Sequence, residues 1–330
     1  MKRSFSYLLA GLLFSGSLFG GTISGKIRNG SKGQGIPENL TVRLFKIPRE
    51  GDETAKRVLS AALPARGSKF LFSNVPFDST AIFLPEVEYR GVKYYGDSVW
   101  VSSGNSRETS NIIVYDTTAS DSALSILSHH LLIEPQGKFI LVEEIIVVEN
   151  SGDRTFLGNL ANGAKTHPDF YFQLPEKATN LVYVDLNQSK SFEKTDGGFY
   201  DKSPFLPGRK QYRFAYDLPS PDPSLSFTKT ITLPTRKLDI IPMDSTLIIS
   251  GANFDVFKIS DTPVSAYMLK DLTTRRNINI KIAGLKPPPA NMTLWFLIGF
   301  VLILLVSAGF FARALIKKNM KRGPEKVLLD

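Results

Sequence analysis

Two adjacent histidines, His129 and His130, are the first candidates for chemistry in this sequence, because neutral imidazole is the commonest metal ligand in proteins. In a β-strand, neighbouring side chains point to opposite faces of the sheet, so two such rings rarely share one metal ion. His167 is the third and last histidine of the chain. The pattern therefore favours one packed ring and one solvated ring, and it leaves a metal-dependent hydrolase using the His129 region as an alternative.

Three carboxylates, Glu143, Glu144 and Glu149, are candidates for a general acid and a general base. Such a pair needs both groups in one cleft, whereas adjacent strand residues face opposite ways, so we expect them on solvated faces and at turns. The chain has no cysteine and lacks the Gly-x-Ser-x-Gly, Gly-x-x-x-x-Gly-Lys-Ser/Thr and Gly-x-Gly-x-x-Gly motifs. The sequence therefore predicts no catalytic residue, no bound metal and no cofactor.

A group of aromatic residues is the remaining candidate. Tyr94, Tyr95 and Trp100 lie close in the sequence to Arg90 and Lys93. Aromatic rings beside basic side chains can stack on sugars or anchor a partner protein. The competing interpretation places half of these rings in the core of a β-sandwich and the others on an edge strand. Tyr94, Tyr95 and Trp100 are therefore the predicted residues of a binding surface.

The segments that position these residues have the pattern of β-strands separated by turns. Between residues 21 and 116, alternating stretches such as Thr22–Arg28 and Leu40–Ile47 recur without a sustained helical period. A polar segment at 116–122 predicts a linker, and residues 123–286 repeat the strand-rich pattern. The predicted fold class is mainly β, with two consecutive antiparallel β-sandwich domains at 21–116 and 123–286 plus one C-terminal transmembrane helix.

The first of these domains resembles a known family. The stretches Gly-Thr-Ile-Ser-Gly-Lys-Ile at 21–27, Leu-Thr-Val-Arg-Leu-Phe at 40–45 and Lys-Phe-Leu-Phe-Ser-Asn-Val at 69–75 resemble the carboxypeptidase regulatory-like, or transthyretin-like, β-sandwich. The family's glycine before Phe-x-Phe and its Pro-Gly-x-Tyr are replaced by Ser68-Lys69 and by 77–80, which indicates a divergent member. The resemblance implies a structural or binding module. The whole arrangement is similar to prokaryotic envelope proteins with a second sandwich and a C-terminal anchor.

Both ends of the chain carry apolar segments beside basic residues. Residues 1–20 have the pattern of a secretory signal peptide, and their poor cleavage site leaves an uncleaved anchor as an alternative. Residues 292–316 predict a transmembrane helix, because their uncharged core 294–312 would span about 29 Å. The basic tail 317–330 follows it. The positive-inside rule then places this tail in the cytoplasm and the bulk of the chain outside it.

The charge and the cysteine count restrict the function further. Much of the net charge of +9 comes from the basic residues of the two flanks, so no nucleic-acid partner is predicted. The absence of cysteine in a two-domain exported chain favours a bacterial or archaeal envelope protein. The leading hypothesis is a non-enzymatic interaction or assembly-accessory protein, anchored in the cytoplasmic membrane by its C-terminal helix and bound to an envelope protein. The alternative is a module that binds glycan or cell-wall material.

Overall fold

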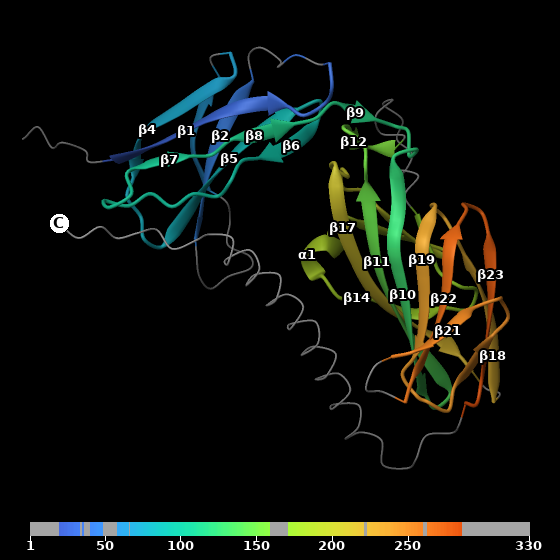
Figure 1. Cartoon of the computed structure of the whole chain (residues 1–330). Helices are drawn as coiled ribbons and strands as arrows, with labels where there is room; N and C mark the ends of the chain where they lie inside the picture. Colours follow the sequence, from blue (N-terminus) through green and yellow to red (C-terminus); the bar gives the residue numbers. More distant parts are fainter. Residues whose placement is uncertain are drawn as a thin grey trace, which may run out of the picture.

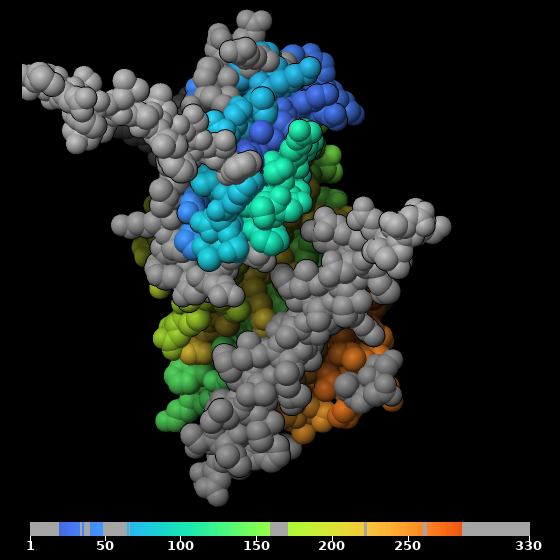
Figure 2. Space-filling view, turned by 90° about the vertical axis from the view of Figure 1, so that its left-hand side faces the viewer, coloured from blue at the N-terminus to red at the C-terminus, as the bar shows by residue number. Residues whose placement is uncertain are grey.

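The computed structural model describes residues 20–33, 35, 40–48, 58–65, 67–158, 171–220, 223–259 and 263–285. Strands dominate these residues, which confirms the mainly β class. The described chain forms two units, each with its own cluster of buried apolar side chains. Figure 1 shows the two units with β9 and β12 between them. In Figure 2 the first unit, coloured blue to teal, lies above the second, coloured green to orange.

The described residues of the first unit form eight strands in two sheets. One sheet has the order β4-β1-β7 with β8 also paired to β1, and the other has the order β3-β2-β5-β6. The strands are β1 (Gly20–Asn29), β2 (Thr41–Pro48), β3 (Val58–Pro64), β4 (Lys69–Pro76), β5 (Ala81–Tyr89), β6 (Val92–Tyr95), β7 (Arg107–Thr109) and β8 (Ile112–Val114). The inward residues of β1, β2 and β5 alternate along each strand and form one apolar core.

Not every strand pair is antiparallel, which corrects the predicted fold class. Strand β1 pairs with β7 and with β8 in parallel, and in the second unit β10 pairs with β19 in parallel. The partners in each pair are far apart in sequence, so no hairpin turn fixes their direction. Alternation of apolar residues predicts a strand and its buried face, but it does not predict the direction of the neighbouring strand.

The second unit is built on a seven-stranded sheet with the order β14-β17-β11-β10-β19-β22-β21. Two three-stranded sheets, β13-β16-β15 and β18-β23-β20, contribute to the same apolar core. The elements are β9 (Thr117–Thr118), β10 (Leu124–Gln136), β11 (Phe139–Asn150), β12 (Thr155–Phe156), β13 (Tyr171–Gln173), β14 (Thr179–Tyr183), α1 (Leu186–Ser189), β15 (Phe192–Thr195), β16 (Gly198–Asp201), β17 (Gly208–Pro219), β18 (Ser224–Thr230), β19 (Thr235–Pro242), β20 (Ile248–Ser250), β21 (Asp255–Lys258), β22 (Ser265–Leu272) and β23 (Asn277–Ala283).

The hairpin of β10 and β11 sets the frame of this sheet. Gln136 pairs with Phe139 across a two-residue turn, in which Gly137 has a φ of +69°, a value that glycine adopts without strain. A bulge between Ile126 and Ser128 shifts the register of the first strand. The shift brings His129 onto the buried face of the sheet, opposite Ile146.

The predicted transmembrane helix is not part of the described fold. No helix among the described residues is long and apolar enough to cross a membrane, and the α-helix that they contain, α1, has four residues. The expected signal peptide, apart from Gly20, and the helix and tail expected at 292–316 and 317–330 lie outside the described residues. The predicted fold class is therefore corrected to a mainly β chain without a membrane-spanning helix in its described part. The predicted single-pass location in the cytoplasmic membrane is corrected with it.

Candidate functional site

Two charged residues occupy core positions in the second unit. On β11, Glu144 lies between the buried residues Val142 and Ile146 on the same face and is itself fully buried. On β18, Lys229 follows Phe227 on the buried face. Each charge therefore occupies a position that the two-residue period of a strand assigns to the core. The fold brings these two opposite charges together between the seven-stranded sheet and a three-stranded sheet.

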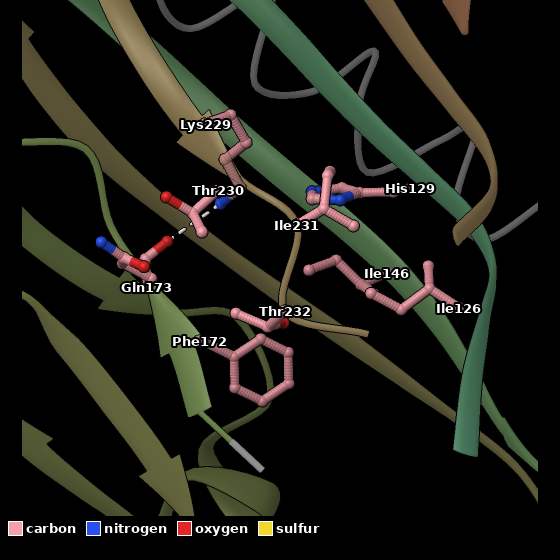
Figure 3. A pocket seen from close by; sticks show the side chains of 9 residues that line it. All are labelled: Ile126, His129, Ile146, Phe172, Gln173, Lys229, Thr230, Ile231 and Thr232. Carbon is pink, nitrogen blue, oxygen red and sulfur yellow. Dashed lines mark hydrogen bonds between the residues drawn. The ribbon is translucent and has the colours of Figure 1, made fainter. Parts of the chain in front are cut away.

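The carboxylate of Glu144 is surrounded by donors. The Lys229 ammonium donates to both of its oxygens at 2.6 and 2.7 Å, the His129 Nε2–H donates at 2.7 Å, and the Tyr216 hydroxyl donates at 2.7 Å. Lys229 also donates to the carbonyl oxygen of Gln173 at 3.1 Å (Figure 3). These contacts join β10, β11, β13, β17 and β18. We call Glu144, His129, Tyr216 and Lys229 the core charge cluster.

The protonation states of the core charge cluster follow from burial and from the ion pair. Burial alone would raise the pKa of Glu144, but the Lys229 ammonium and the hydrogen bonds from His129 and Lys229 lower it to about 2. Burial and the neighbouring carboxylate raise the pKa of Tyr216 well above its usual value. At neutral pH the cluster therefore contains an ionised carboxylate beside a protonated phenol.

His129 remains neutral in this environment. Burial lowers the pKa of His129, against the opposing effect of the Glu144 charge. Because a carboxylate only accepts hydrogen bonds, Nε2 carries the proton and Nδ1 is an acceptor. Nδ1 is buried and has no hydrogen-bond partner among the residues that the structure describes. His129 also lines a cavity of about 20 Å³, which has room for about one water molecule and is shown in Figure 3.

The core charge cluster is therefore closed to a substrate. Its cavity is too small for an organic molecule, and the Lys229 ammonium is saturated with acceptors. Within the described ranges, no group of three or more His, Asp or Glu side chains is arranged to hold a metal ion. His167, the third histidine, lies outside those ranges. The cluster can join the two layers of the unit by charge, and the hydrolase alternative stays a prediction.

His130 and Glu143 are next in the sequence to His129 and Glu144 of the cluster, and their side chains lie on the opposite face of the sheet. His130 Nδ1 lies 3.0 Å from Asp239 Oδ2 and its side chain is partly exposed, while Glu143 pairs with Arg213. The adjacent histidines therefore do not act on one ion, as the strand alternation predicts. The expectation that Glu144 is solvated or at a turn is wrong. Both faces of β11 are rich in apolar residues, so alternation alone did not identify the buried side.

The predicted aromatic surface is divided by the same alternation. Tyr94 is 1% exposed, so it does not belong to a surface, and this part of the prediction is corrected. Tyr95 and Trp100 are 42% and 41% exposed, and the indole N–H of Trp100 donates to the carbonyl oxygen of Asp78. Ligand binding by Tyr95 and Trp100 stays a prediction. The Tyr94 hydroxyl instead contacts the carbonyl oxygen of Tyr115 at 2.7 Å and the Thr155 hydroxyl at 2.8 Å.

The contact between Tyr94 and Thr155 belongs to a second polar cluster, at the junction of the two units. Asp116, which the sequence places at the start of a linker, has a buried carboxylate that accepts from the Tyr89 hydroxyl at 2.6 Å and lies 3.1 Å from Arg90 Nε. The Asp116 main chain accepts from the Thr155 N–H at 2.8 Å. Burial would raise the pKa of Asp116, but Tyr89 and Arg90 lower it.

Other contacts strengthen this junction. The hydroxyl of Ser31 donates to the Asp153 carbonyl oxygen at 2.6 Å and accepts from the Asp116 N–H at 2.8 Å. Strand β9 pairs in parallel with β12, and Leu157 packs against the core of the first unit. The expected linker at 116–122 is therefore partly a structural element that joins the units. Its short polar residues gave no signal of burial, because their partners are distant in sequence.

Comparison with known proteins gives no family assignment. No protein-family model matches the chain, and no curated protein sequence matches it. The carboxypeptidase regulatory-like resemblance stays a prediction. Among solved structures, the full-length major pilin SpaD from Corynebacterium diphtheriae is 9% identical, with a TM-score of 0.22 and coverage of 82% of this chain and 84% of the pilin.

A second solved structure, the major pilin SpaA from the same organism, is 10% identical, with a TM-score of 0.21. That match covers 63% of this chain and 61% of the pilin, so this chain spans less than two thirds of that pilin. TM-scores of this size do not establish a common fold. The contacts described above therefore carry the functional argument.

Proposed function

We propose that this chain is a non-enzymatic protein that works by contact with a partner protein, with its two β-rich units acting as one body. The observation that carries the proposal is the Asp116 junction, where one carboxylate and its main chain contact both units. A buried, ionised and hydrogen-bonded junction resists bending more than a solvated linker does. A fixed arrangement of two units suits a protein that presents a large surface to a partner.

The ionisable residues support the same proposal. Glu144, His129 and Lys229 contact one another in the core, and their contacts are structural. Several large apolar side chains are exposed on strands instead, among them those of Leu71, Ile113 and Ile248. Exposed apolar side chains are typical of protein interaction sites where they form a contiguous patch. An envelope protein as the partner remains the hypothesis from the sequence.

The test is capture of partners by the full-length chain. The tagged chain is crosslinked chemically in the cells that produce it, purified, and analysed for crosslinked peptides. We expect partner peptides joined to the described surface, and a several-fold smaller yield from Asp116→Asn, which weakens the junction. Asp196→Asn makes the same chemical change in an exposed turn and should leave the yield unchanged. The proposal is wrong if the wild-type chain enriches no protein over the tag alone.

A second candidate function is glycan binding, because Tyr95 and Trp100 are both exposed. Exposed aromatic rings can stack on sugar faces. Binding of cell-wall polysaccharide to the purified chain, measured by calorimetry and lost in Trp100→Ala, would support this candidate. Equal binding by Trp100→Ala and the wild type would exclude Trp100 from it. Leu71→Ala, at an exposed position on β4, is the control.

A further inference from the structure

Among the described residues, the seven-stranded sheet ends at β14, and no further strand pairs with this edge. In the described chain β14 pairs only with β17, and the N–H of Val184, just after β14, donates to the Arg213 carbonyl oxygen at 3.1 Å. In an antiparallel pair, the main-chain groups of successive residues point alternately toward and away from the partner strand. The N–H and carbonyl oxygen of Tyr183 therefore point away from β17, toward the open side.

An exposed apolar stripe runs along this edge. Val182 and Val184 are 59% and 47% exposed, and in an extended chain residues two apart lie on one face. Tyr183, between the two valines, instead packs its ring against Phe192 at 4.9 Å. The core thus fixes the orientation of the strand and holds the two valines outward.

The open edge lacks the protection that sheet edges usually carry. Natural edges avoid pairing by means of charged side chains, proline or bulges. Residues 179–184 contain no charge and no proline, and their bulge lies before Val182, so Val182 and Tyr183 keep a regular register with β17. The opposite edge of the same sheet, β21, carries Asp255 and Lys258 within four residues. Charge therefore protects one edge of the sheet and not the other.

We propose that β14 pairs with β14 of a second copy of this chain, antiparallel, about a two-fold axis at Tyr183. The outward main-chain groups of Tyr183 then exchange two hydrogen bonds with those of the second copy. Val182 of each copy lies opposite Val184 of the other, and no like charges meet within 179–184. Both copies contribute the same strand to this two-fold interface, so no further copy can add to it. The pairing therefore gives a dimer and covers the unprotected edge.

This inference rests on the proposed function, because it names a second copy as one partner. It is tested on the purified full-length chain alone, whereas the proposed function is tested by capture of other proteins. The failure of one test is therefore distinguishable from the failure of the other. The chain has no cysteine, so any introduced cysteine is unique.

The experiment mixes two single variants, Val182→Cys and Val184→Cys, and follows disulfide formation on non-reducing gels. The two Cα atoms would be about 4.5 Å apart across the dimer, within disulfide range. Each variant alone places its two cysteines at least a diagonal step apart, roughly 7–8 Å. We expect several-fold more crosslinked dimer from the mixture than from either variant alone. Val256→Cys mixed with Val182→Cys is the control, because Val256 on β21 is also 59% exposed.

A charge rescue gives an independent readout by sedimentation velocity. Val182→Lys with Val184→Lys places like charges opposite each other and should give a monomer. Val182→Lys with Val184→Glu places opposite charges there and should restore the dimer. The proposal is overturned if the mixture crosslinks no better than the control pair, or if the double-lysine variant sediments as the wild type does.

Discussion

Lys229 Nζ lies 2.6 and 2.7 Å from the two carboxylate oxygens of Glu144, and both side chains are buried. Lys229 is on β18 of a three-stranded sheet and Glu144 is on β11, an inner strand of the seven-stranded sheet, so the ion pair joins the two layers. Two buried charges are costly to desolvate, and the His129 and Tyr216 hydrogen bonds offset part of that cost.

Removal of one partner should therefore destabilise the chain strongly. We expect Glu144→Gln to lower the free energy of unfolding by roughly 3–5 kcal/mol, because Lys229 is left buried without a counter-charge. The double variant Glu144→Leu with Lys229→Met should recover most of this loss, since it removes both charges. Urea denaturation followed by circular dichroism measures both. Glu193→Gln breaks an exposed ion pair with Lys202 and should cost less than about 1 kcal/mol. A double variant that loses as much stability as Glu144→Gln, or more, would contradict the coupling.

Acid should destabilise the chain in two stages. The folded state lowers the pKa of His129 from 6.5, so the unfolded chain binds more protons below about pH 6.5 and stability falls from there. It lowers the pKa of Glu144 from 4.5 to about 2, so a further loss of roughly 3 kcal/mol falls between these values. Urea midpoints measured from pH 8 to pH 2 test this. His129→Gln should reduce the first stage and keep the second, and the remainder of the first stage comes from His130, whose pKa burial also lowers. If the first stage were unchanged in that variant, groups other than His129 would cause the loss of stability below about pH 6.5.

The sequence predicted the positions of the strands better than the way in which the strands pair and pack. Alternation located β1, β2 and β11 and indicated one packed and one exposed histidine. Lys229 interrupts an apolar stripe on β18, which indicates a buried charge, but Glu143 and Glu144 each interrupt a stripe on β11, so the sequence does not show which of the two is its partner. The parallel pairing of β1 with β7 could not be predicted from the sequence, because only the whole fold brings these two strands together. The burial of Asp116 depends in the same way on Tyr89 and Thr155.

Tyr94 and Tyr95 should respond very differently to the same change. Tyr94→Phe removes a hydroxyl that contacts the Tyr115 carbonyl oxygen and the Thr155 hydroxyl, and leaves both without this partner. We expect a loss of about 1–3 kcal/mol in the free energy of unfolding. Tyr95→Phe changes an exposed side chain and should alter it by less than about 0.5 kcal/mol. Thermal and urea denaturation of the two variants give this comparison. Similar losses from both variants would show that burial does not determine the size of the loss in the free energy of unfolding.

Asp116→Asn should uncouple the two units. The carboxamide keeps the shape of the carboxylate but loses its charge, so the Tyr89 and Arg90 contacts weaken at a buried position. We expect the wild-type chain to unfold in one calorimetric transition and the variant to unfold in two, because less free energy then joins the units. Proteolysis of the native variant should be faster at residues 119–122, which follow β9. The exposed Asp196→Asn serves as the control and should behave as the wild type. A single, unshifted transition in Asp116→Asn would show that the contacts of Ser31 and Thr155 hold the junction without the carboxylate.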